Sequence, residues 1–302
     1  MDIKYYPGCT VKTSARNYEA SAIAALRYLG VELSELEQWN CCGVVHTLST
    51  DDLMKQLAPI RVLKHVEQCE EREEVVTLCD MCYNTLSQAN RLVKDDPAKL
   101  KTVNTFMECD DSHGGYTGTV RVVHLLQVLR DTIGFQAIKK KVKYPLRGMK
   151  VFPYYGCMLL RPGEVGIDTP EDPTIIGDLM RALGAEVIDD PVKIECCGSH
   201  HTVGDRSIVF ERIERIIGRA RSKGAEAVVL SCPLCRFNLD TRQQEDRTIE
   251  LPLPVFYYTQ LMGVAFGLDE AVLGLNEHRI DPRPLLREIG YQKKGEYGRI
   301  TT

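Results

Sequence analysis

Residues 40–48, NCCGVVHTL, place two adjacent cysteines before a glycine, and residues 195–203, ECCGSHHTV, repeat this pattern in the second half of the chain. Each copy has a single cysteine upstream and a Cys-x-x-Cys pair downstream, at matched spacings. The first set is Cys9, Cys41, Cys42, Cys79 and Cys82. The second set is Cys157, Cys196, Cys197, Cys232 and Cys235. Such a repeat indicates an internal duplication and therefore two homologous lobes.

The sequence around the cysteines repeats as well. YYPGC at residues 5–9 resembles PYYGC at 153–157, and EEVVTLCDMC at 73–82 resembles AEAVVLSCPLC at 225–235. Short runs rich in β-branched and aromatic residues predict strands. They lie at residues 3–6, 31–33, 75–78, 151–155, 186–188 and 228–230.

Helices are predicted between the strands from apolar periodicity and from capping residues. In the first lobe Thr13 or Ser14 begins a helix that Gly30 ends, and in the second lobe Asp172 begins and Gly184 ends the equivalent helix. Two further helices are predicted at residues 120–132 and 205–222. The alternation predicts an α/β protein with a small parallel sheet, flanked by helices, in each lobe.

The same pattern predicts how the chain is divided. We expect a first lobe at 1–95, an inter-lobe segment with a helix at 96–148, and a second lobe with a C-terminal extension at 149–302.

Four cysteines are predicted just past the carboxyl ends of strands, where open α/β sheets bind their ligands. They are Cys9, Cys79, Cys157 and Cys232. Each Cys-x-x-Cys pair should begin a helix, so free backbone N–H groups would face the bound centre and favour negative charge there. Gly43 and Gly198 lack a side chain and let each vicinal pair wrap closely around a bulky object.

Composition narrows the function classes. The formal charge of −4 and the pI near 6.0 do not indicate the basic surface that nucleic acids or acidic membranes bind. The N-terminal sequence does not resemble a signal peptide, and no apolar run is long enough for a membrane span. We therefore expect a cytoplasmic protein, in which twelve cysteines indicate metal binding or redox chemistry instead of disulfides.

The number of cysteines in each set bears on the kind of metal centre. A structural zinc takes four ligands, and a cubane iron–sulfur cluster takes four cysteines, usually in a compact spacing that this chain lacks. Five cysteines in each set fit a larger centre, or a reactive site with a spare thiolate.

The two cysteine sets resemble the duplicated CCG domain found in the B subunits of heterodisulfide reductases. The resemblance covers nearly the whole chain and includes VRVVHLLQVL at 120–129, VFPYYGC at 151–157, SCPLCRFNLD at 231–240, LPVFYYTQLMGVAFGL at 253–268 and LGLNEHRIDPRPLL at 273–286.

This resemblance implies that each five-cysteine set binds one noncubane [4Fe-4S] cluster. It also implies a substrate disulfide, such as that of coenzymes M and B, which is reduced between the clusters in two one-electron steps. The implied partners are the ferredoxin-like C subunit and the flavin-containing A subunit of heterodisulfide reductase. A hydrogenase or formate dehydrogenase module often belongs to the same complex.

Other functions remain open at this stage. Related proteins act on other sulfur substrates, and CCG domains also serve as electron relays in respiratory complexes. A zinc-stabilised scaffold is a third hypothesis, because Cys-x-x-Cys pairs also bind zinc.

Several residues outside the two sets are candidates for substrate binding or proton transfer. His46 and His201 follow the two CCG motifs, and they either line the substrate gap or cap the next helix. Four cations follow cluster cysteines and could bind an anionic substrate, although most such residues are simply solvated: Lys12, Arg16, Arg161 and Arg236.

Two cysteines and one histidine have no predicted part in a cluster. Cys69 is predicted to be a buried, inert thiol beside Val62 and Val66. Cys109 is predicted to be an exposed spare thiol, and the role of His200 is left open.

Overall fold

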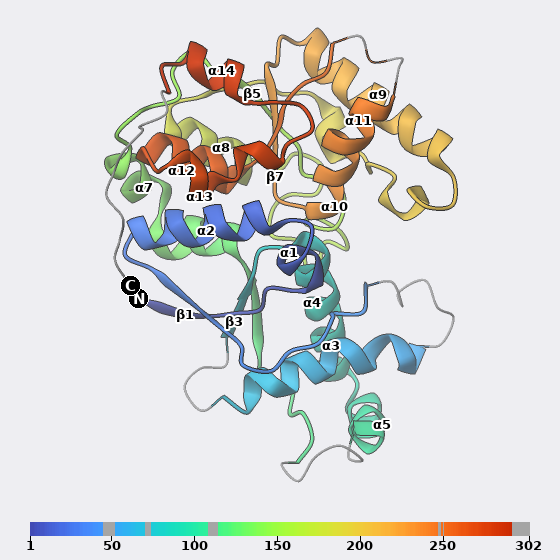
Figure 1. Cartoon of the computed structure of the whole chain (residues 1–302). Coiled ribbons are helices and arrows are strands. Elements are labelled where there is room, and N and C mark those ends of the chain that lie inside the picture. The colour runs from blue at the N-terminus through green and yellow to red at the C-terminus, as the bar shows by residue number, and fades with distance from the viewer. Residues whose placement is uncertain (45–51, 70–73, 108–113, 247–248, 250, 292–302) are drawn as a thin grey trace.

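The computed structural model describes residues 1–44, 52–69, 74–107, 114–246, 249 and 251–291. Over these ranges the strands form two four-stranded sheets (Figure 1). The first sheet has the order β2 (Glu32–Glu35), β1 (Asp2–Tyr5), β3 (Glu74–Thr77) and β4 (Arg121–His124). The second has the order β6 (Glu186–Val187), β5 (Lys150–Pro153), β7 (Ala227–Leu230) and β8 (Val255–Tyr257). All neighbouring strands are parallel, which confirms the predicted α/β fold with a duplicated parallel sheet.

Helices connect the strands in both lobes. Up to the second sheet they are α1 (Cys9–Lys12), α2 (Arg16–Tyr28), α3 (Asp52–Glu67), α4 (Asp80–Asp95), α5 (Pro97–Met107), α6 (Leu125–Gln127), the π-helix η3 (Val128–Ile133) and α7 (Phe135–Lys141). The later ones are α8 (Ile175–Leu183), η4 (Pro191–Ile194), η5 (Ser199–His201), α9 (Arg206–Ser222), α10 (Pro233–Arg236), η6 (Phe237–Arg242), α11 (Gln243–Glu245), α12 (Tyr258–Phe266), α13 (Glu270–Leu273), η7 (Leu275–Glu277) and α14 (Arg283–Glu288).

The central strands form the core of each lobe. β7, with the sequence AVVL, is buried along its whole length, and β3 is buried at Val75, Val76 and Thr77. This continuous burial is typical of parallel strands that helices cover on both faces. The edge strand β2, with the sequence ELSE, is largely exposed, and its charges oppose pairing with another chain.

The prediction of one helix over residues 120–132 is wrong at its start. Residues 121–124 form β4 and pair in parallel with β3, and helical structure begins only with α6. A short run of apolar residues fits either a strand or a buried helix, and here pairing with β3 decides for the strand. Because the segment 96–148 thus completes the first sheet, we propose that the first lobe extends to about residue 148.

Two predicted helix caps are also corrected. Neither Thr13 nor Ser14 caps α2, whose N-cap residue Ala15 offers no side-chain hydrogen bond. In the second lobe the carboxylate of Asp168, not that of Asp172, accepts hydrogen bonds of 2.7 Å from the backbone amides at the start of α8. The capping residue lies several positions upstream because the chain turns back before the helix begins.

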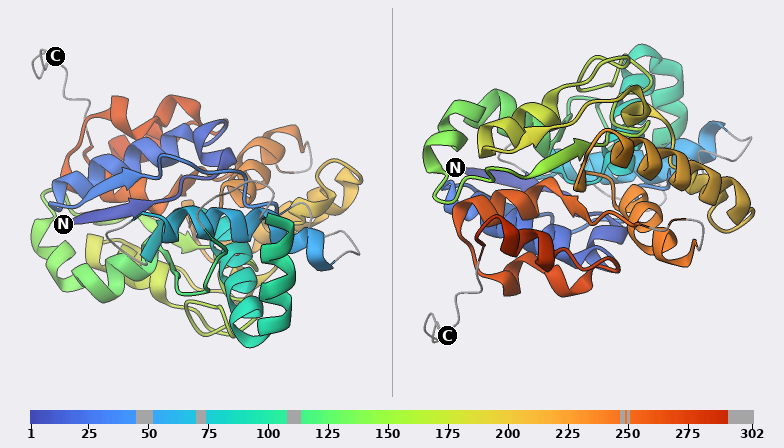
Figure 2. Two further views of the ribbon diagram at one scale, coloured as in Figure 1. Left: turned by 90° about the horizontal axis from the view of Figure 1, so that it is seen from below. Right: turned by 90° about the horizontal axis from the view of Figure 1, so that it is seen from above.

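The two lobes share a buried interface in which α2 of the first lobe lies against α12 of the second (Figures 1 and 2). The rings of Tyr18 and Tyr257 stack with centroids 4.0 Å apart and planes 1° apart. The hydroxyls of Ser21 and Thr259 are 2.7 Å apart and buried. The lobes are therefore held by direct packing, which fixes the position of one cysteine set relative to the other.

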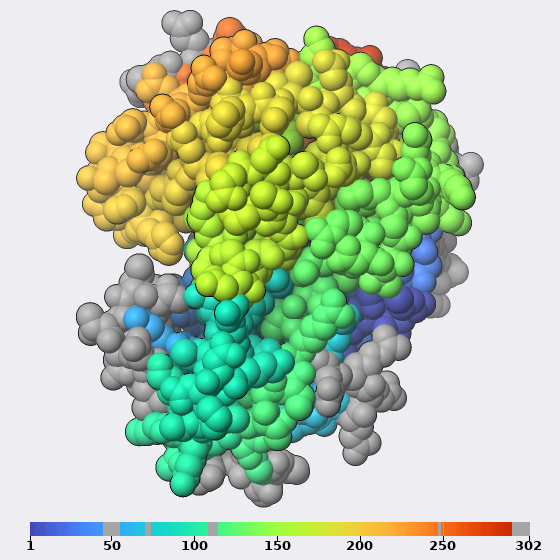
Figure 3. Space-filling view, turned by 180° about the vertical axis from the view of Figure 1, so that it is seen from behind, coloured from blue at the N-terminus to red at the C-terminus, as the bar shows by residue number. Residues whose placement is uncertain are grey.

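A second inter-lobe contact joins α4 to the segment after Cys157. The buried amide of Asn84 donates hydrogen bonds of 2.7 Å to the carbonyls of Met158 and Arg161. The hydroxyl of Tyr83 donates to the carbonyl of Val165 at 2.8 Å. In Figure 3 this segment, in yellow-green, lies against the teal surface of α4.

We expect the substitution Asn84→Ala to lower the free energy of unfolding by about 2–3 kcal/mol, because it removes the buried amide that donates both of these inter-lobe hydrogen bonds. Urea denaturation followed by circular dichroism measures this change. Thr102→Ala, which removes an exposed hydroxyl from α5, is the control and should stay within about 0.5 kcal/mol of the wild type. Equal midpoints for the two variants would show that the Asn84 contact does not hold the lobes together.

Candidate functional site

The fold places the cysteines of both sets at the carboxyl edges of the two sheets. Cys9 is the first residue of α1, just after β1, and Cys157 follows β5. Cys79 and Cys232 are the N-cap residues of α4 and α10, both with φ −89° and ψ 122°. The prediction that each Cys-x-x-Cys pair begins a helix is confirmed, so the positive end of a helix faces each set.

Within each set the thiols form a chain of close neighbours. The Sγ atoms of Cys9 and Cys41 are 3.6 Å apart, those of Cys157 and Cys196 are 4.0 Å apart, and those of Cys197 and Cys235 are 3.5 Å apart. Hydrogen bonds between thiols complete the contacts. The first thiol chain runs Cys9, Cys41, Cys42, Cys82, Cys79. The second runs Cys157, Cys196, Cys197, Cys235, Cys232.

This crowding separates the pKa values of the thiols. Hydrogen bonds from Cys41 and Cys82 lower the pKa of Cys42, while the pKa of Cys82 is raised by hydrogen bonding to Cys42 and by burial. In the second set, hydrogen bonds from Cys157 and Cys197 lower the pKa of Cys196. Five thiols this close cannot all ionise without a compensating cation. A cationic centre would supply that charge and release the remaining protons.

Matched backbone contacts hold the vicinal cysteines in the two lobes. The hydroxyl of Tyr6 donates to the carbonyl of Asn40 at 2.9 Å, and that of Tyr154 donates to the carbonyl of Glu195 at 2.6 Å. Each carbonyl belongs to the residue just before a vicinal pair. The amides of the two CCG glycines contact Sγ of Cys41 and Cys196 at 3.5 and 3.4 Å, respectively.

A glycine before the first cysteine of each set makes room for sulfur. A Cβ on Gly8 would lie 2.7 Å from Sγ of Cys82, and a Cβ on Gly156 would lie 3.4 Å from Sγ of Cys235. Both glycines have positive φ, 73° and 64°. The backbone therefore passes directly beside the thiols, a close approach that only glycine allows.

The strand ends that precede Cys79 and Cys232 are joined across the lobes, because the hydroxyl of Tyr18 donates to Leu78 and its ring stacks on Tyr257, which pairs with Leu230. A hydrogen bond from Cys235 lowers the pKa of Cys232, but burial and the charges of Asp80 and Cys79 raise it overall. Cys232 of the second lobe is therefore within electrostatic reach of Cys79 of the first lobe. Figure 1 shows α1, α4 and α10, which carry cysteines of the two sets, on the same side of the molecule.

A buried histidine–carboxylate pair lies at the strand end that precedes Cys79. His124 Nε2 is 3.2 Å from Oδ1 of Asp80 and 2.9 Å from the carbonyl of Leu78. The amide of Leu126 donates to His124 Nδ1 at 3.2 Å, so the ring proton lies on Nε2. The ring is thereby oriented toward the residues on either side of Cys79.

Of the two histidines predicted to belong to the site, the structure describes one. His46 lies outside the described residues, and His201 is exposed at the end of η5. The pKa of Cys196 is lowered mainly by hydrogen bonds from Cys157 and Cys197, and the charge of His200 is a smaller cause in the same direction. His200, whose role the sequence left open, thus acts on the second set.

The predicted cations are held in different ways. Lys12 pairs with Glu19 at 2.8 Å and with Glu35 at 2.5 Å, so its charge is already compensated. Arg236 is buried and its NH2 group lies 3.0 Å from Oδ2 of Asp240.

The two remaining arginines have unpaired charges. The guanidinium groups of Arg16 and Arg161 hydrogen-bond only to backbone carbonyls within the described part of the chain. They are therefore the cations best placed to receive an anionic group from outside.

The two cysteines outside the sets stay apart from the thiol chains. Cys69 is half-buried just past the end of α3, and its thiol donates to the carbonyl of His65 at 3.3 Å. The prediction of a buried thiol is wrong because the helix ends at Glu67, before the cysteine. Cys109 lies outside the described residues.

Sequence reasoning missed Tyr6, Tyr154, His124 and Tyr257 as residues of the site. Alignment on Cys9 and Cys157 places a tyrosine three positions before each. His124 and Tyr257 end the fourth strand of their sheets, and each is followed three residues later by a glutamine whose Oε1 accepts a hydrogen bond from its backbone amide. The shared pattern, HLLQ at 124–127 and YYTQ at 257–260, is the signal that could have found them.

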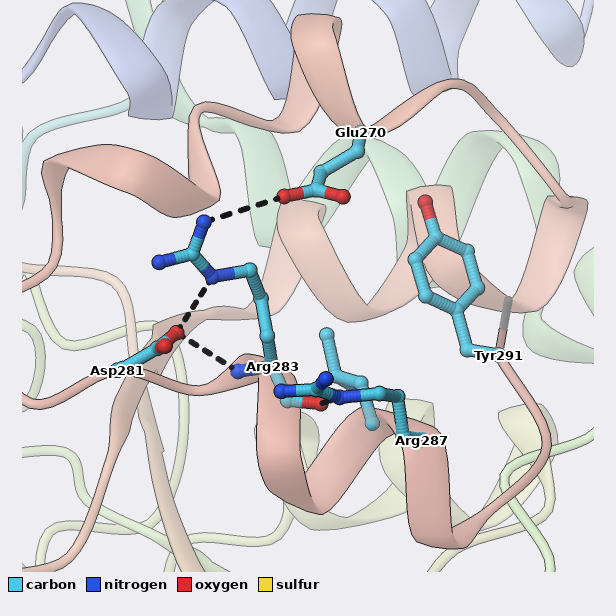
Figure 4. Close-up of a pocket in the computed structure, with 6 residues that line it drawn as sticks. Glu270, Asp281, Arg283, Arg287 and Tyr291 are labelled. Atoms are coloured by element: carbon cyan, nitrogen blue, oxygen red, sulfur yellow. Dashed lines mark hydrogen bonds and ion pairs between the residues drawn. The ribbon is translucent and has the colours of Figure 1, made fainter. Parts of the chain in front are cut away.

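A separate pocket of about 340 Å³ lies on the C-terminal segment, away from the thiols (Figure 4). Arg283 crosses it, with Nε 2.7 Å from Oδ1 of Asp281 and NH1 3.8 Å from Oε1 of Glu270. Arg287 and Tyr291 complete the wall that Figure 4 shows. Its two arginines and two carboxylates balance one another, so the pocket offers no net charge to a ligand.

Two further features of the described ranges concern metals and membranes. Within these ranges no three Cys, His, Asp or Glu side chains converge as ligands of one metal ion. None of the helices there combines the length and hydropathy that a membrane span needs.

Comparison with known proteins matches both halves of the chain to the same family. The model of the cysteine-rich CCG domain matches residues 3–87 and 151–240, one match in each half of the chain. The chain is 33% identical over 288 residues to the 8-methylmenaquinol:fumarate reductase membrane anchor subunit of Wolinella succinogenes, covering 94% of this chain and 99% of that protein.

Two further matches extend the comparison. The B subunit of the ferredoxin/F(420)H(2)-dependent CoB-CoM heterodisulfide reductase of Methanosarcina acetivorans is 27% identical over 294 residues, with 95% of this chain and 96% of that protein covered. The solved structure of a hypothetical protein from Helicobacter pylori shares the fold, with a TM-score of 0.72 and 11% identity over 92% of this chain. The chain spans about half, 51%, of that protein.

Proposed function

Because the chain belongs to the family of proteins with the cysteine-rich CCG domain, we propose that it is the catalytic iron–sulfur subunit of an oxidoreductase complex that cleaves a disulfide. The observation that carries this proposal is that two matched five-thiol chains lie at strand ends joined across the lobes, since Tyr18 bonds to Leu78 and stacks on Tyr257, which pairs with Leu230. Cleavage of a disulfide consumes two electrons and two protons and yields two thiols. Two one-electron centres on either side of one S–S bond match this stoichiometry.

Each thiol chain fits an iron–sulfur cluster. The donors are all sulfur, a glycine beside each thiol chain leaves room at the thiols, and a backbone N–H already points at one sulfur of each vicinal pair. We propose noncubane [4Fe-4S] clusters, the first held by Cys9, Cys41, Cys42, Cys79 and Cys82, the second by Cys157, Cys196, Cys197, Cys232 and Cys235. Once bound, each cluster would supply one-electron redox chemistry.

The protein's own side chains would bind and orient the substrate. Arg16 and Arg161 follow the first cysteine of each set and pair with no carboxylate of the described residues, which suits them to bind anionic groups at the two ends of a disulfide. Lys12 would act more weakly on the substrate, since it is already paired with two carboxylates, and the NH2 group of Arg236 is paired with Asp240. His46 and His201, which follow the two vicinal cysteine pairs in the sequence, are proposed as proton donors.

Electrons would have to come from another protein of the complex. The chain lacks the Gly-x-Gly-x-x-Gly fingerprint of a dinucleotide site and the compact ferredoxin spacing. We propose a ferredoxin-like C subunit and a flavin-containing A subunit as partners, with the disulfide of coenzymes M and B as the model substrate.

The similarity to the fumarate reductase subunit favours a second candidate. Its 33% identity over 94% of this chain exceeds the 27% identity to the heterodisulfide reductase protein of Methanosarcina acetivorans. In this alternative the two clusters would relay electrons within a respiratory complex, and no disulfide would be bound.

One assay separates the two candidates. The protein, with clusters reconstituted under anaerobic conditions, is mixed with reduced methyl viologen and the coenzyme M–coenzyme B disulfide, and released thiols are counted. Two thiols for every two dye molecules oxidised support disulfide cleavage. Reoxidation of the clusters by a quinone analogue without any thiol release from the disulfide would favour the relay.

We expect Arg161→Ala to raise KM for the anionic disulfide about tenfold and to leave kcat nearly unchanged, because one charge-assisted hydrogen bond to the bound substrate is lost. Steady-state assays at constant ionic strength measure both constants. Arg181→Ala on α8, where Arg181 pairs with Asp178, is the control for the loss of a surface charge. A similar KM in both variants would remove Arg161 from the substrate site.

A further inference from the structure

Several buried hydrogen-bond donors at the carboxyl edge of the second sheet have no partner among the described residues; besides the hydroxyls of Ser231 and Tyr258, two are of interest here. They are the hydroxyl of Tyr257, a residue that is 0% exposed, and Nε of Arg236, a residue that is 7% exposed. Leaving such donors unpaired costs about 1–3 kcal/mol each, and more for a charged group. Two of them on elements that pack together, α10 and β8, therefore indicate an acceptor that the protein itself does not provide.

Both residues lie near the strand ends that are joined across the lobes. Tyr257 ends β8 and pairs with Leu230 of β7, two residues before Cys232. Its ring also stacks on Tyr18, whose hydroxyl donates to the carbonyl of Leu78 at 2.9 Å, next to Cys79. Tyr257 thus spans from one set to the other.

The Arg236 guanidinium is fixed in place beside the second set, directly after Cys235. Its NH2 group lies 3.0 Å from Asp240 and donates to the carbonyl of Glu277 at 2.7 Å. Asp240 in turn accepts hydrogen bonds from the amides of Arg279 and Ile280 at 2.9 and 3.1 Å. These hydrogen bonds and the ion pair fix the guanidinium, so its Nε cannot turn away toward solvent.

The corresponding positions of the first lobe have their partners. His124 occupies the place of Tyr257 and is bonded on both ring nitrogens, and Tyr83 occupies the place of Arg236 and donates to Val165. At these two positions, therefore, only the second lobe has donors without a partner among the described residues.

We propose, on the basis of the proposed function, that Tyr257 and Arg236 form a subsite that binds an anionic sulfur atom between the two cysteine sets. Two donors, one of them charged, select an acceptor with negative charge. Burial raises the pKa of the Tyr257 hydroxyl, so it keeps its proton as a donor, although the charge of Arg236 opposes that rise. A thiolate released from a substrate and a sulfur of the cluster both have this chemistry.

The variant Tyr257→Phe tests the subsite, because it removes only the hydroxyl and keeps the ring stacked on Tyr18. Cluster-loaded wild type and variant are titrated with 2-mercaptoethanesulfonate under oxidising conditions and followed by electron paramagnetic resonance. Their spectra without thiol and their midpoint potentials are also recorded. Tyr258→Phe is the matched control, since Tyr258 is equally buried, its ring also contacts Tyr18, its hydroxyl likewise has no partner among the described residues, and it is not part of the proposed subsite. Arg236→Lys, which keeps the charge but removes Nε, serves as a second variant.

We expect Tyr257→Phe to bind the thiol about ten- to a hundredfold more weakly than wild type if the subsite holds the substrate sulfur. If the subsite holds a cluster sulfur, the spectrum and the midpoint potential change without thiol. Wild-type values in Tyr257→Phe for thiol affinity, spectrum and potential overturn the subsite. A wild-type protein that takes up no iron–sulfur cluster overturns the proposed function itself, and the subsite with it.

Discussion

The variant Cys232→Ser is expected to lose disulfide-cleaving activity to below about a thousandth of the wild type while it keeps roughly half of the iron and acid-labile sulfide. Cys232 ends the second thiol chain and follows Leu230, which pairs with Tyr257 where that ring stacks on Tyr18 of the first lobe. Serine is nearly isosteric, but its hydroxyl is a poor ligand for iron in a thiolate site. The second set should therefore fail to hold its cluster, while the first set keeps its own.

The same experiment on Cys79 gives the matched result, because Cys79 holds the equivalent position in the first set with the same backbone angles. Cys69→Ser is the control, since Cys69 lies in neither thiol chain, and it should keep full iron and full activity. Anaerobic iron and sulfide analysis alongside the thiol-release assay gives both readouts. Full activity in Cys232→Ser would show that the second set is dispensable and would favour the electron relay.

The second large effect is expected for Gly8→Ala. Gly8 has φ 73° and ψ 162°, a region that is essentially restricted to glycine, and the added Cβ would lie 2.7 Å from Sγ of Cys82. We expect a loss of about 1–3 kcal/mol from the backbone alone, and displacement of the Cys82 thiol in addition. Iron bound by the first set should fall to near zero, while that of the second set is unchanged.

A control separates backbone strain from the steric contact. Gly30 also has a positive φ, 81°, but no atom lies within 4 Å of the position that an added Cβ would take. Gly30→Ala should therefore lower the melting temperature without loss of iron. If Gly8→Ala and Gly30→Ala both bind full iron, the close approach of the backbone to Cys82 has no part in the site.

Much of this fold could be predicted from the sequence because the cysteine repeat marks equivalent points of two lobes. β3 and β7 were predictable since VVT and AVVL lead directly into Cys-x-x-Cys pairs. β4 was not predictable, because its partner β3 lies more than forty residues earlier in the chain. The local sequence of such a strand looks the same as that of a buried helix. The cap at Asp168 was missed for a similar reason, since its contacts depend on a turn that precedes the helix.

The candidate site was predictable in its sulfur atoms but not in the groups that surround them. Cys79 and Cys232 were expected to begin helices, and they do. That they approach each other depends on packing of α2 against α12, which lies beside the stack of Tyr18 on Tyr257. A contact between lobes has no sequence spacing of its own, so Tyr257 emerged only from the structure.

The central claim is that each five-thiol chain holds one [4Fe-4S] cluster. Native mass spectrometry of the protein purified without oxygen tests it most directly. Two clusters would add about 0.7 kDa to the 34.0 kDa chain, in the composition of eight iron and eight sulfide. A mass that corresponds to bound zinc, or to a single cluster in the fully loaded protein, would contradict the account.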